Sequence, residues 1–154
     1  MSFDLNIILR ENIKKLVPYS SARDEYKGKD GVFLDANENA YGAPLKEKEV
    51  QYNRYPDPLQ LEVKEKLSKI KGLPVENIFL GNGSDEAIDI LFRAFCNPGK
   101  DNAIICPPTY GMYEVSANIN DVATIKVPLT PETFQLDTEK ILKAINVNTK
   151  LIFI

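Results

Sequence analysis

Residues 78–86 read Ile78-Phe79-Leu80-Gly81-Asn82-Gly83-Ser84-Asp85-Glu86, a short apolar run that breaks into a glycine turn. Apolar residues then recur at helical spacing as far as Phe95, so the segment predicts a strand, a turn and a helix that begins near Ser84. The first backbone N–H groups of a helix lack intrahelical partners, and the helix dipole adds positive charge there. The pattern therefore predicts an anion site, with phosphate as the expected anion.

The residues of this turn favour a phosphate without proving one. Gly81 and Gly83 lack the side chains that would hold a phosphate away from the backbone, and Ser84 is expected to cap the helix. A plain strand-to-helix turn explains the same residues equally well. Glu86 stands where a dinucleotide-binding loop needs its third glycine, and no Gly-Lys-Ser/Thr follows as in a nucleotide-binding P-loop. We therefore expect a phosphate other than that of NAD or ATP.

Composition narrows the function further. The chain has 154 residues, of which 44% are hydrophobic and 27% charged, as in an ordinary globular domain with one core. Its net charge is −3 and it has no basic cluster, so we expect small-molecule ligands and neither nucleic acid nor a membrane. No run resembles a membrane span or a signal peptide, which predicts a cytoplasmic protein.

The set of potentially reactive side chains in this sequence excludes several types of catalytic and metal site. Histidine is absent, which removes Ser-His, Cys-His and most zinc chemistry, and no metal site is expected. Cys96 and Cys106 are isolated from each other in sequence and are predicted to be buried, reduced thiols. Acid–base chemistry must therefore come from lysine, tyrosine, carboxylates or a cofactor.

Strand and helix patterns alternate along most of the chain. This alternation predicts an α/β fold with a mostly parallel sheet and flanking helices. A long loop over residues 35–58, rich in Asn, Pro, Gly and Tyr, is expected to carry function or a subunit contact. The predicted helices are Asn6–Leu16, Asp57–Ile70, Ser84–Phe95, Thr109–Asn118 and one capped by Asp137, and the predicted strands are Val32–Leu34, Ile78–Leu80, Ala103–Cys106, Thr124–Val127 and Leu151–Ile154.

Several motifs together carry a family resemblance. They are Pro18-Tyr19-Ser20-Ser21-Ala22-Arg23, Leu34-Asp35-Ala36-Asn37-Glu38-Asn39-Ala40-Tyr41-Gly42, Asn53-Arg54-Tyr55-Pro56, Gly83-Ser84-Asp85-Glu86 and Cys106-Pro107-Pro108-Thr109-Tyr110-Gly111-Met112-Tyr113. Jointly they resemble the N-terminal part of the histidinol-phosphate aminotransferases, which are pyridoxal-phosphate (PLP) enzymes of fold type I. The resemblance implies an N-terminal helix and arm over residues 1–31. It implies an incomplete PLP-binding large domain over residues 32–154 that stops within a strand.

The resemblance also assigns cofactor-binding residues. The backbone of Gly83, Ser84 and Asp85 would hold the phosphate of PLP, in agreement with the anion site inferred from the glycine turn. Tyr110 would stack on the pyridine ring, where offset aromatic contact is favourable; a core tyrosine beside two prolines is the ordinary alternative. Tyr55 would reach across the interface of a homodimer to the partner's cofactor phosphate.

The substrate residues implied by the resemblance are fewer. Tyr19 would lie near the phosphate end of the substrate, and Asn39 would lie near the substrate as well. Loop packing for the tyrosine and turn chemistry for the asparagine are the ordinary alternatives. Ala40 departs from the family, in which many members place proline there, and this loosens the substrate assignment.

The resemblance predicts a function and also what this chain lacks. It implies transfer of an amino group between L-histidinol phosphate and 2-oxoglutarate, in histidine biosynthesis. The lysine that binds the cofactor is expected after Ile154, so no catalytic residue is assigned within this chain, which we expect to be inactive alone. Lys69 is interpreted as a solvated helix residue. The alternatives are an aromatic aminotransferase, a threonine-phosphate decarboxylase, or a non-catalytic fragment that binds phosphate or a partner chain.

Overall fold

The structure is a computed structural model that describes residues 3–20, 26, 31–34, 36–43 and 52–154. Contacts divide the chain into two compact units. One unit combines Met1–Leu16 with Gly81–Ile154, and the other is Val17–Leu80. The division at residue 31 that the sequence suggests stays a prediction.

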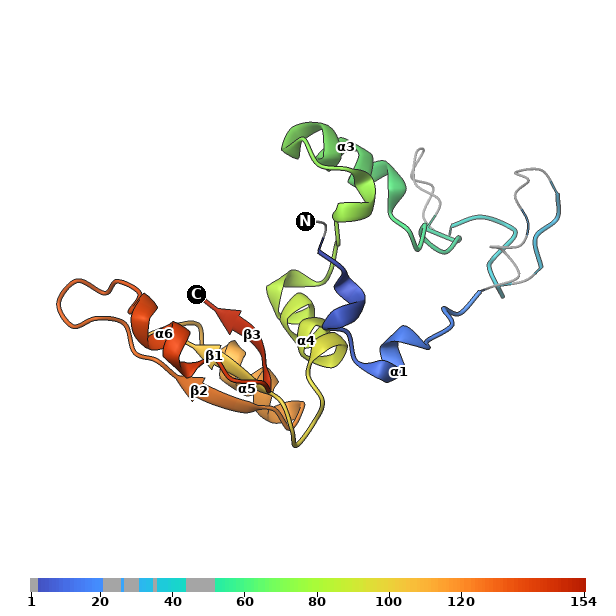
Figure 1. Ribbon diagram of the computed structural model, residues 1–154. Coiled ribbons are helices and arrows are strands. Elements are labelled where there is room, and N and C mark those ends of the chain that lie inside the picture. The colour runs from blue at the N-terminus through green and yellow to red at the C-terminus, as the bar shows by residue number, and fades with distance from the viewer. Residues whose placement is uncertain (1–2, 21–25, 27–30, 35, 44–51) are drawn as a thin grey trace. The chain divides into compact units, whose positions relative to one another are not determined.

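A parallel sheet forms the centre of the first unit. Strands β1 (Asn102–Ile105), β2 (Ala123–Lys126) and β3 (Thr149–Phe153) lie in the order β2-β1-β3 (Figure 1). Both pairings of β1 are parallel, and Ile104 lies opposite Ile125 on one side and Ile152 on the other. Every residue of β1 is buried, as its continuous apolar run predicts for a central parallel strand. The predicted mostly parallel sheet is confirmed.

Helices cover both faces of this sheet. Helices α4 (Gly83–Phe95) and α5 (Met112–Ile119) pack on one face, and α6 (Thr138–Ala144) packs on the other. The first face buries Ile88, Phe92, Cys96, Ala103, Ala117 and Val122, and the second buries Ile104, Cys106, Val127 and Ile141. Neighbouring residues of β1 thus serve opposite cores, because side chains alternate along a strand. Both cysteines are free and buried, as predicted.

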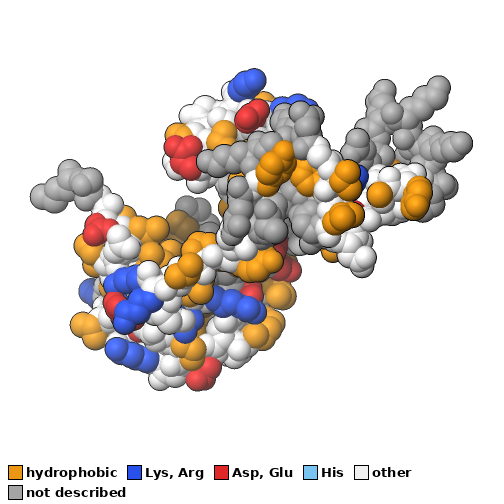
Figure 2. Space-filling model, turned by 90° about the vertical axis from the view of Figure 1, so that its right-hand side faces the viewer, with side chains coloured by type: hydrophobic (Ala, Val, Ile, Leu, Met, Phe, Trp, Pro, Cys, Tyr) orange, Lys and Arg blue, Asp and Glu red, His pale blue; other side chains and the backbone are white. Residues whose placement is uncertain are grey.

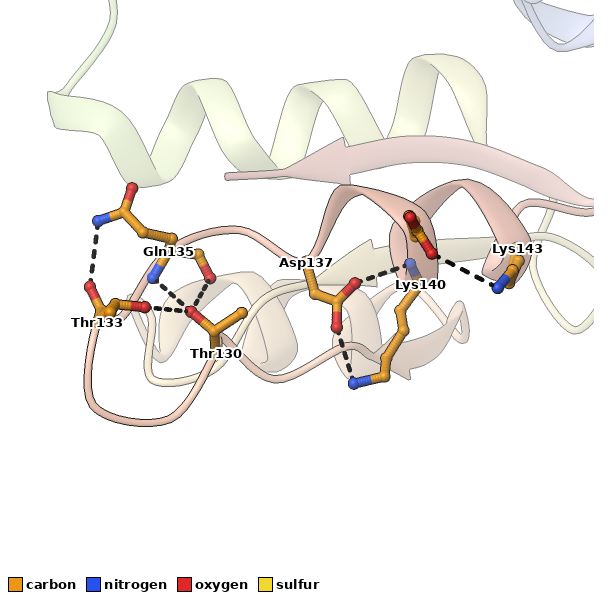
Figure 3. A network of polar contacts seen from close by, with 7 residues as sticks. Thr130, Thr133, Gln135, Asp137, Lys140 and Lys143 are labelled. Carbon is orange, nitrogen blue, oxygen red and sulfur yellow. Dashed lines mark hydrogen bonds and ion pairs between the residues drawn. The ribbon is translucent and has the colours of Figure 1, made fainter.

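Polar contacts organise the connection from β2 to α6 (Figure 3). The Thr130 hydroxyl accepts a hydrogen bond from the backbone N–H of Gln135 at 3.0 Å and lies 2.7 Å from the hydroxyl of Thr133. Asp137 then caps α6 as predicted, because its carboxylate accepts from the backbone N–H of Lys140 at 3.0 Å. These contacts fix where the chain turns back toward β3.

The single helix predicted over Asn6–Leu16 is wrong. The structure has a 3-10 helix η1 (Leu5–Ile7) and a short helix α1 (Glu11–Lys14), separated by an extended Arg10. The backbone N–H of Arg10 donates to the carbonyl of Ala94, at the end of α4, over 3.1 Å. This tertiary bond replaces a helical one, and helices this short have little stability of their own.

In the second unit, helix α3 (Leu61–Lys71) begins later than the sequence predicts. Pro58 does not open the helix, because Gln60 adopts a φ of 53° and interrupts it. Gln60 holds the cap position in place of the predicted Asp57, although the Asp57 carboxylate accepts from the backbone N–H of Leu61 at 2.8 Å. Gly72 ends the helix in the left-handed conformation, as its position predicts. A 3-10 turn, η2 (Val75–Asn77), follows.

Two predicted strands, Val32–Leu34 and Ile78–Leu80, are wrong, because the structure gives neither segment a strand conformation. Val32, Leu34 and Phe79 are exposed. A strand exists only where a neighbouring strand accepts and donates its backbone hydrogen bonds. Three-residue apolar runs predict strands equally well whether or not such a neighbour is present.

Candidate functional site

The N-terminus of α4 presents open backbone donors at the position where the sequence predicts an anion site. Gly83 begins the helix with a φ of 77°, a conformation that glycine adopts without strain. The backbone N–H groups of Ser84 and Asp85 precede the first intrahelical bond, and no residue in the described ranges accepts from them. A Cβ added at Gly83 would meet nothing within 4 Å, so the approach to these donors is open. A phosphate fits this arrangement.

The cap of α4 differs from the prediction. Ser84 does not cap the helix, because the helix starts one residue earlier and Asn82 occupies the cap position without a side-chain bond. The Glu86 carboxylate instead accepts a hydrogen bond from the backbone N–H of Asn82. This reach of a first-turn acid back to the cap residue resembles half of a capping box, and the acid's place after the turn was the signal for it. Glu86 is thereby directed at the turn.

Tyr110 lies next to this helix start. It follows the carboxyl end of β1, and its hydroxyl donates to the Asp85 carboxylate at 3.0 Å. This hydrogen bond, with some burial and the charge of Asp85, raises the pKa of the Tyr110 hydroxyl. The Tyr110 side chain remains half exposed, so a face of its ring is available to a ligand. The structure therefore brings Gly83, Ser84, Asp85 and Tyr110 together.

A ladder of aromatic rings supports Tyr110 from the core. Its ring meets Tyr113 edge-on, with centroids 5.7 Å apart and planes at 87°. Tyr113 stacks on Phe153 at 4.4 Å, and Phe153 contacts Phe92 at 5.4 Å. The sequence analysis assigned no role to Tyr113, although its spacing of three residues from Tyr110 was the available signal. The exposed ring beside free backbone donors fits a phosphorylated aromatic ligand such as PLP.

The second unit brings two other predicted residues together. Asn39 and Tyr55 both line a shallow pocket of about 260 Å³. Between them lies Glu38, whose side chain is only 3% exposed and which accepts from Arg54 at 2.8 Å. Glu38 also accepts from the backbone N–H of Tyr55 at 2.7 Å. Sequence reasoning assigned no role to Glu38 or Arg54, because a single acid in a polar loop gives no pattern.

The remaining substrate residues are placed less favourably. Both polar atoms of the Asn39 amide serve its own loop: Nδ2 donates to the carbonyl of Gly42 at 2.7 Å, and Oδ1 accepts from the N–H of Tyr41 at 3.0 Å. This is the turn chemistry that the sequence analysis gave as the alternative. Tyr19 is 90% exposed, and the structure does not bring it to Asn39 or Tyr55.

Another pocket, of about 340 Å³, lies in the first unit. Its lining includes Lys100 and Asp121, which precede β1 and β2, so it sits at the amino ends of the strands. Ligands of open α/β sheets bind at the carboxyl ends of the strands, where Tyr110 is found, so this pocket is given no role in the site.

Within the described ranges, no three acidic or cysteine side chains gather as metal ligands. No helix in these ranges is long and apolar enough to cross a membrane.

The charged side chains are mixed over the surface. Figure 2 shows acidic and basic side chains interspersed with hydrophobic ones on the visible face. Lys69, which follows a serine, is exposed on α3, as predicted for a solvated residue.

Comparisons with known proteins bear on the family and the fold of this chain. The sequence profile of the family described as aminotransferase class I and II matches residues 29–154. A histidinol-phosphate aminotransferase of Cytophaga hutchinsonii is 61% identical over all of this chain, which spans 43% of that protein. One of Bacteroides thetaiotaomicron is 58% identical over 97% of this chain and 41% of its own length. The crystal structure of cystalysin from Treponema denticola, which contains PLP, is similar to this chain with a TM-score of 0.57 and 22% sequence identity. The match covers 64% of this chain and 27% of the cystalysin chain, and it supports the fold.

Proposed function

The chain belongs to the class I and II aminotransferases, and we propose that the protein transfers an amino group between L-histidinol phosphate and 2-oxoglutarate, with PLP as cofactor. The observation that carries the cofactor assignment is the pair of open backbone donors at Ser84 and Asp85 beside the ring of Tyr110. The choice of substrate rests on the similarity to relatives of that name. The chain spans less than half the length of these relatives.

Each residue at the start of α4 has a defined task in this proposal. The N–H groups of Ser84 and Asp85 bind the cofactor phosphate, and Gly83 leaves room for it. The ring of Tyr110 covers one face of the pyridine ring and excludes water from it. When bound, the cofactor supplies an aldehyde for the amino group and an electron sink. The protein supplies orientation and a fixed electrostatic surrounding.

The second unit contributes residues that reach outward. We propose that Tyr55 binds the phosphate of the partner's cofactor in a cytoplasmic homodimer, as the family resemblance implies. Its exposure of 73% supports this role, because most of its surface is open to a contact outside its own unit. Asn39 and Tyr19 would line the substrate. Asn39 retains one amide N–H and one oxygen lone pair for that contact.

The test compares substrates on the natural full-length protein. Loaded with PLP, it is expected to form glutamate from 2-oxoglutarate much faster with L-histidinol phosphate than with phenylalanine. Release of carbon dioxide from threonine phosphate would favour the decarboxylase alternative. A preference for phenylalanine would favour an aromatic aminotransferase. Phosphate binding without turnover of any of them would favour a non-catalytic protein.

A further inference from the structure

Glu38 is the one carboxylate among the described residues that line the loop pocket of the second unit. It occupies an irregular loop, yet its side chain is 3% exposed, whereas Arg54 remains partly accessible at 32%. Burying a carboxylate is unfavourable unless the charge is paired and its lone pairs are used. Both oxygens are used: Oε2 accepts from Arg54 Nη1, and Oε1 accepts from the backbone N–H of Tyr55.

These two bonds act on adjacent residues of one turn. Glu38 holds the side chain of Arg54 and the backbone of Tyr55, which follows it directly, and so restricts the rotation of both residues. A further hydrogen bond, from Asn53 Nδ2 to the carbonyl of Asn39 at 2.9 Å, joins the segment that contains Glu38 to the segment that contains Tyr55. The backbone of Tyr55 is thereby fixed, while its side chain is 73% exposed.

We propose that Glu38 is the positioning residue that presents the Tyr55 hydroxyl to the cofactor phosphate. This inference rests on the proposed function. A side chain on a mobile loop loses backbone freedom when it binds, and that loss weakens binding. A side chain whose backbone is already fixed loses only its own rotamer freedom. Glu38 therefore favours phosphate binding without touching the ligand.

A double-mutant cycle on the natural full-length protein separates positioning from plain loop stability. The variants are Glu38→Gln, Tyr55→Phe and both together, and the readout is the dissociation constant of PLP and of pyridoxal, which lacks the phosphate. Glu38→Gln keeps the shape and one acceptor but sets an amide against Arg54 and breaks the ion pair. We expect it to weaken PLP binding about three- to tenfold and to leave pyridoxal unchanged. In a protein that already carries Tyr55→Phe, Glu38→Gln should not change the dissociation constant of PLP any further.

The control is Glu62→Gln, the same chemical change at an exposed ion pair with Lys66, 2.9 Å long, in the same unit. It should leave both dissociation constants unchanged. If Glu38→Gln does not fold, Arg54→Lys tests the same contact, because lysine lacks the guanidinium fork. The phosphate-selective loss is expected there too.

The outcomes distinguish the two proposals. A loss shared equally by pyridoxal, a loss that persists without the Tyr55 hydroxyl, or no loss at all would overturn the positioning role of Glu38. If Tyr55→Phe weakens PLP binding while Glu38→Gln does not, only this inference is lost. If the wild-type protein does not bind PLP, or if Tyr55→Phe and Tyr110→Ala both leave PLP binding unchanged, the proposed function fails as well.

Discussion

Replacing Gly83 by alanine tests whether the start of α4 depends on its backbone conformation. With a φ of 77°, an L-residue at this position is strained by about 1–2 kcal/mol. Alanine also restricts the unfolded chain, which offsets about 0.4–1 kcal/mol of that cost. Since a Cβ would meet nothing within 4 Å, no clash adds to the balance. We expect Gly83→Ala to lower the free energy of unfolding by about 1 kcal/mol.

Gly111 is the matched control, because it precedes α5 with a φ of −61° and also has open space around its Cβ position. Gly111→Ala should be neutral or more stable by about 0.4–1 kcal/mol. Urea unfolding of the natural full-length protein measures both changes. Gly83→Ala should also weaken PLP binding, because relief of the strain turns the Ser84 N–H away from the anion. Gly83→Val should do so more strongly, since its branched side chain also crowds the ligand.

Equal stability of the two alanine variants would contradict the strained φ at Gly83. Unchanged PLP affinity of Gly83→Ala, in protein shown to be folded, would contradict the anion site at Ser84 and Asp85. Because the expected loss of binding follows from the strain, the binding result bears on the anion site only where Gly83→Ala is found to be destabilised.

Three further predictions concern the ring, the thiols and the chain itself. Tyr110→Phe should keep most of the PLP affinity, whereas Tyr110→Ala should lose about two- to tenfold, and equal losses in a binding titration would refute ring stacking. Burial, with the charge of Asp101, raises the pKa of the Cys96 thiol to about 11, so the folded protein keeps the thiol neutral after the unfolded one ionises near 9. The free energy of unfolding should therefore fall as the pH rises from 9 to 11, and Cys96→Ala should remove that part of the slope. Residues 1–154 alone should show no amino transfer with PLP, and borohydride reduction followed by peptide mapping should label no lysine stoichiometrically.

The elements that the sequence predicted correctly are those with long, regular patterns. Helix α4 carries its apolar residues at helical spacing, and strand β1 overlaps the apolar run Ala103–Cys106, so their tertiary neighbours only reinforce what the local pattern favours. The segment Ile78–Leu80 is as apolar as β1, but among the described residues no strand pairs with it, and its backbone there is irregular. Likewise, Arg10 leaves the helical conformation to bond with Ala94, which is far away in sequence. Local propensity cannot reveal such a partner.

The residues of the candidate site also differ in how far the sequence alone could identify them. Glycine spacing located the turn that precedes α4, because backbone geometry is encoded locally, and the family resemblance pointed to the backbone of Ser84 and Asp85. Glu38 could not be found like this, since its role depends on Arg54 and Tyr55, 16 and 17 residues away. Long-range pairs of this kind need the folded loop, and a single sequence contains no pattern for them.

The acidic residues at the start of α4 raise a question of charge, because two carboxylates beside a phosphate would repel it. Both carboxylates keep their charge, but each has a partner of its own: Glu86 accepts from the N–H of Asn82, and Asp85 accepts from the Tyr110 hydroxyl. Each carboxylate is thus held by a donor other than the N–H groups of Ser84 and Asp85, which stay available. The bond from Tyr110 to Asp85 also joins the ring surface to the anion site. The position of the Tyr110 ring is therefore tied to that of the helix start, as a ligand with both an aromatic ring and a phosphate requires.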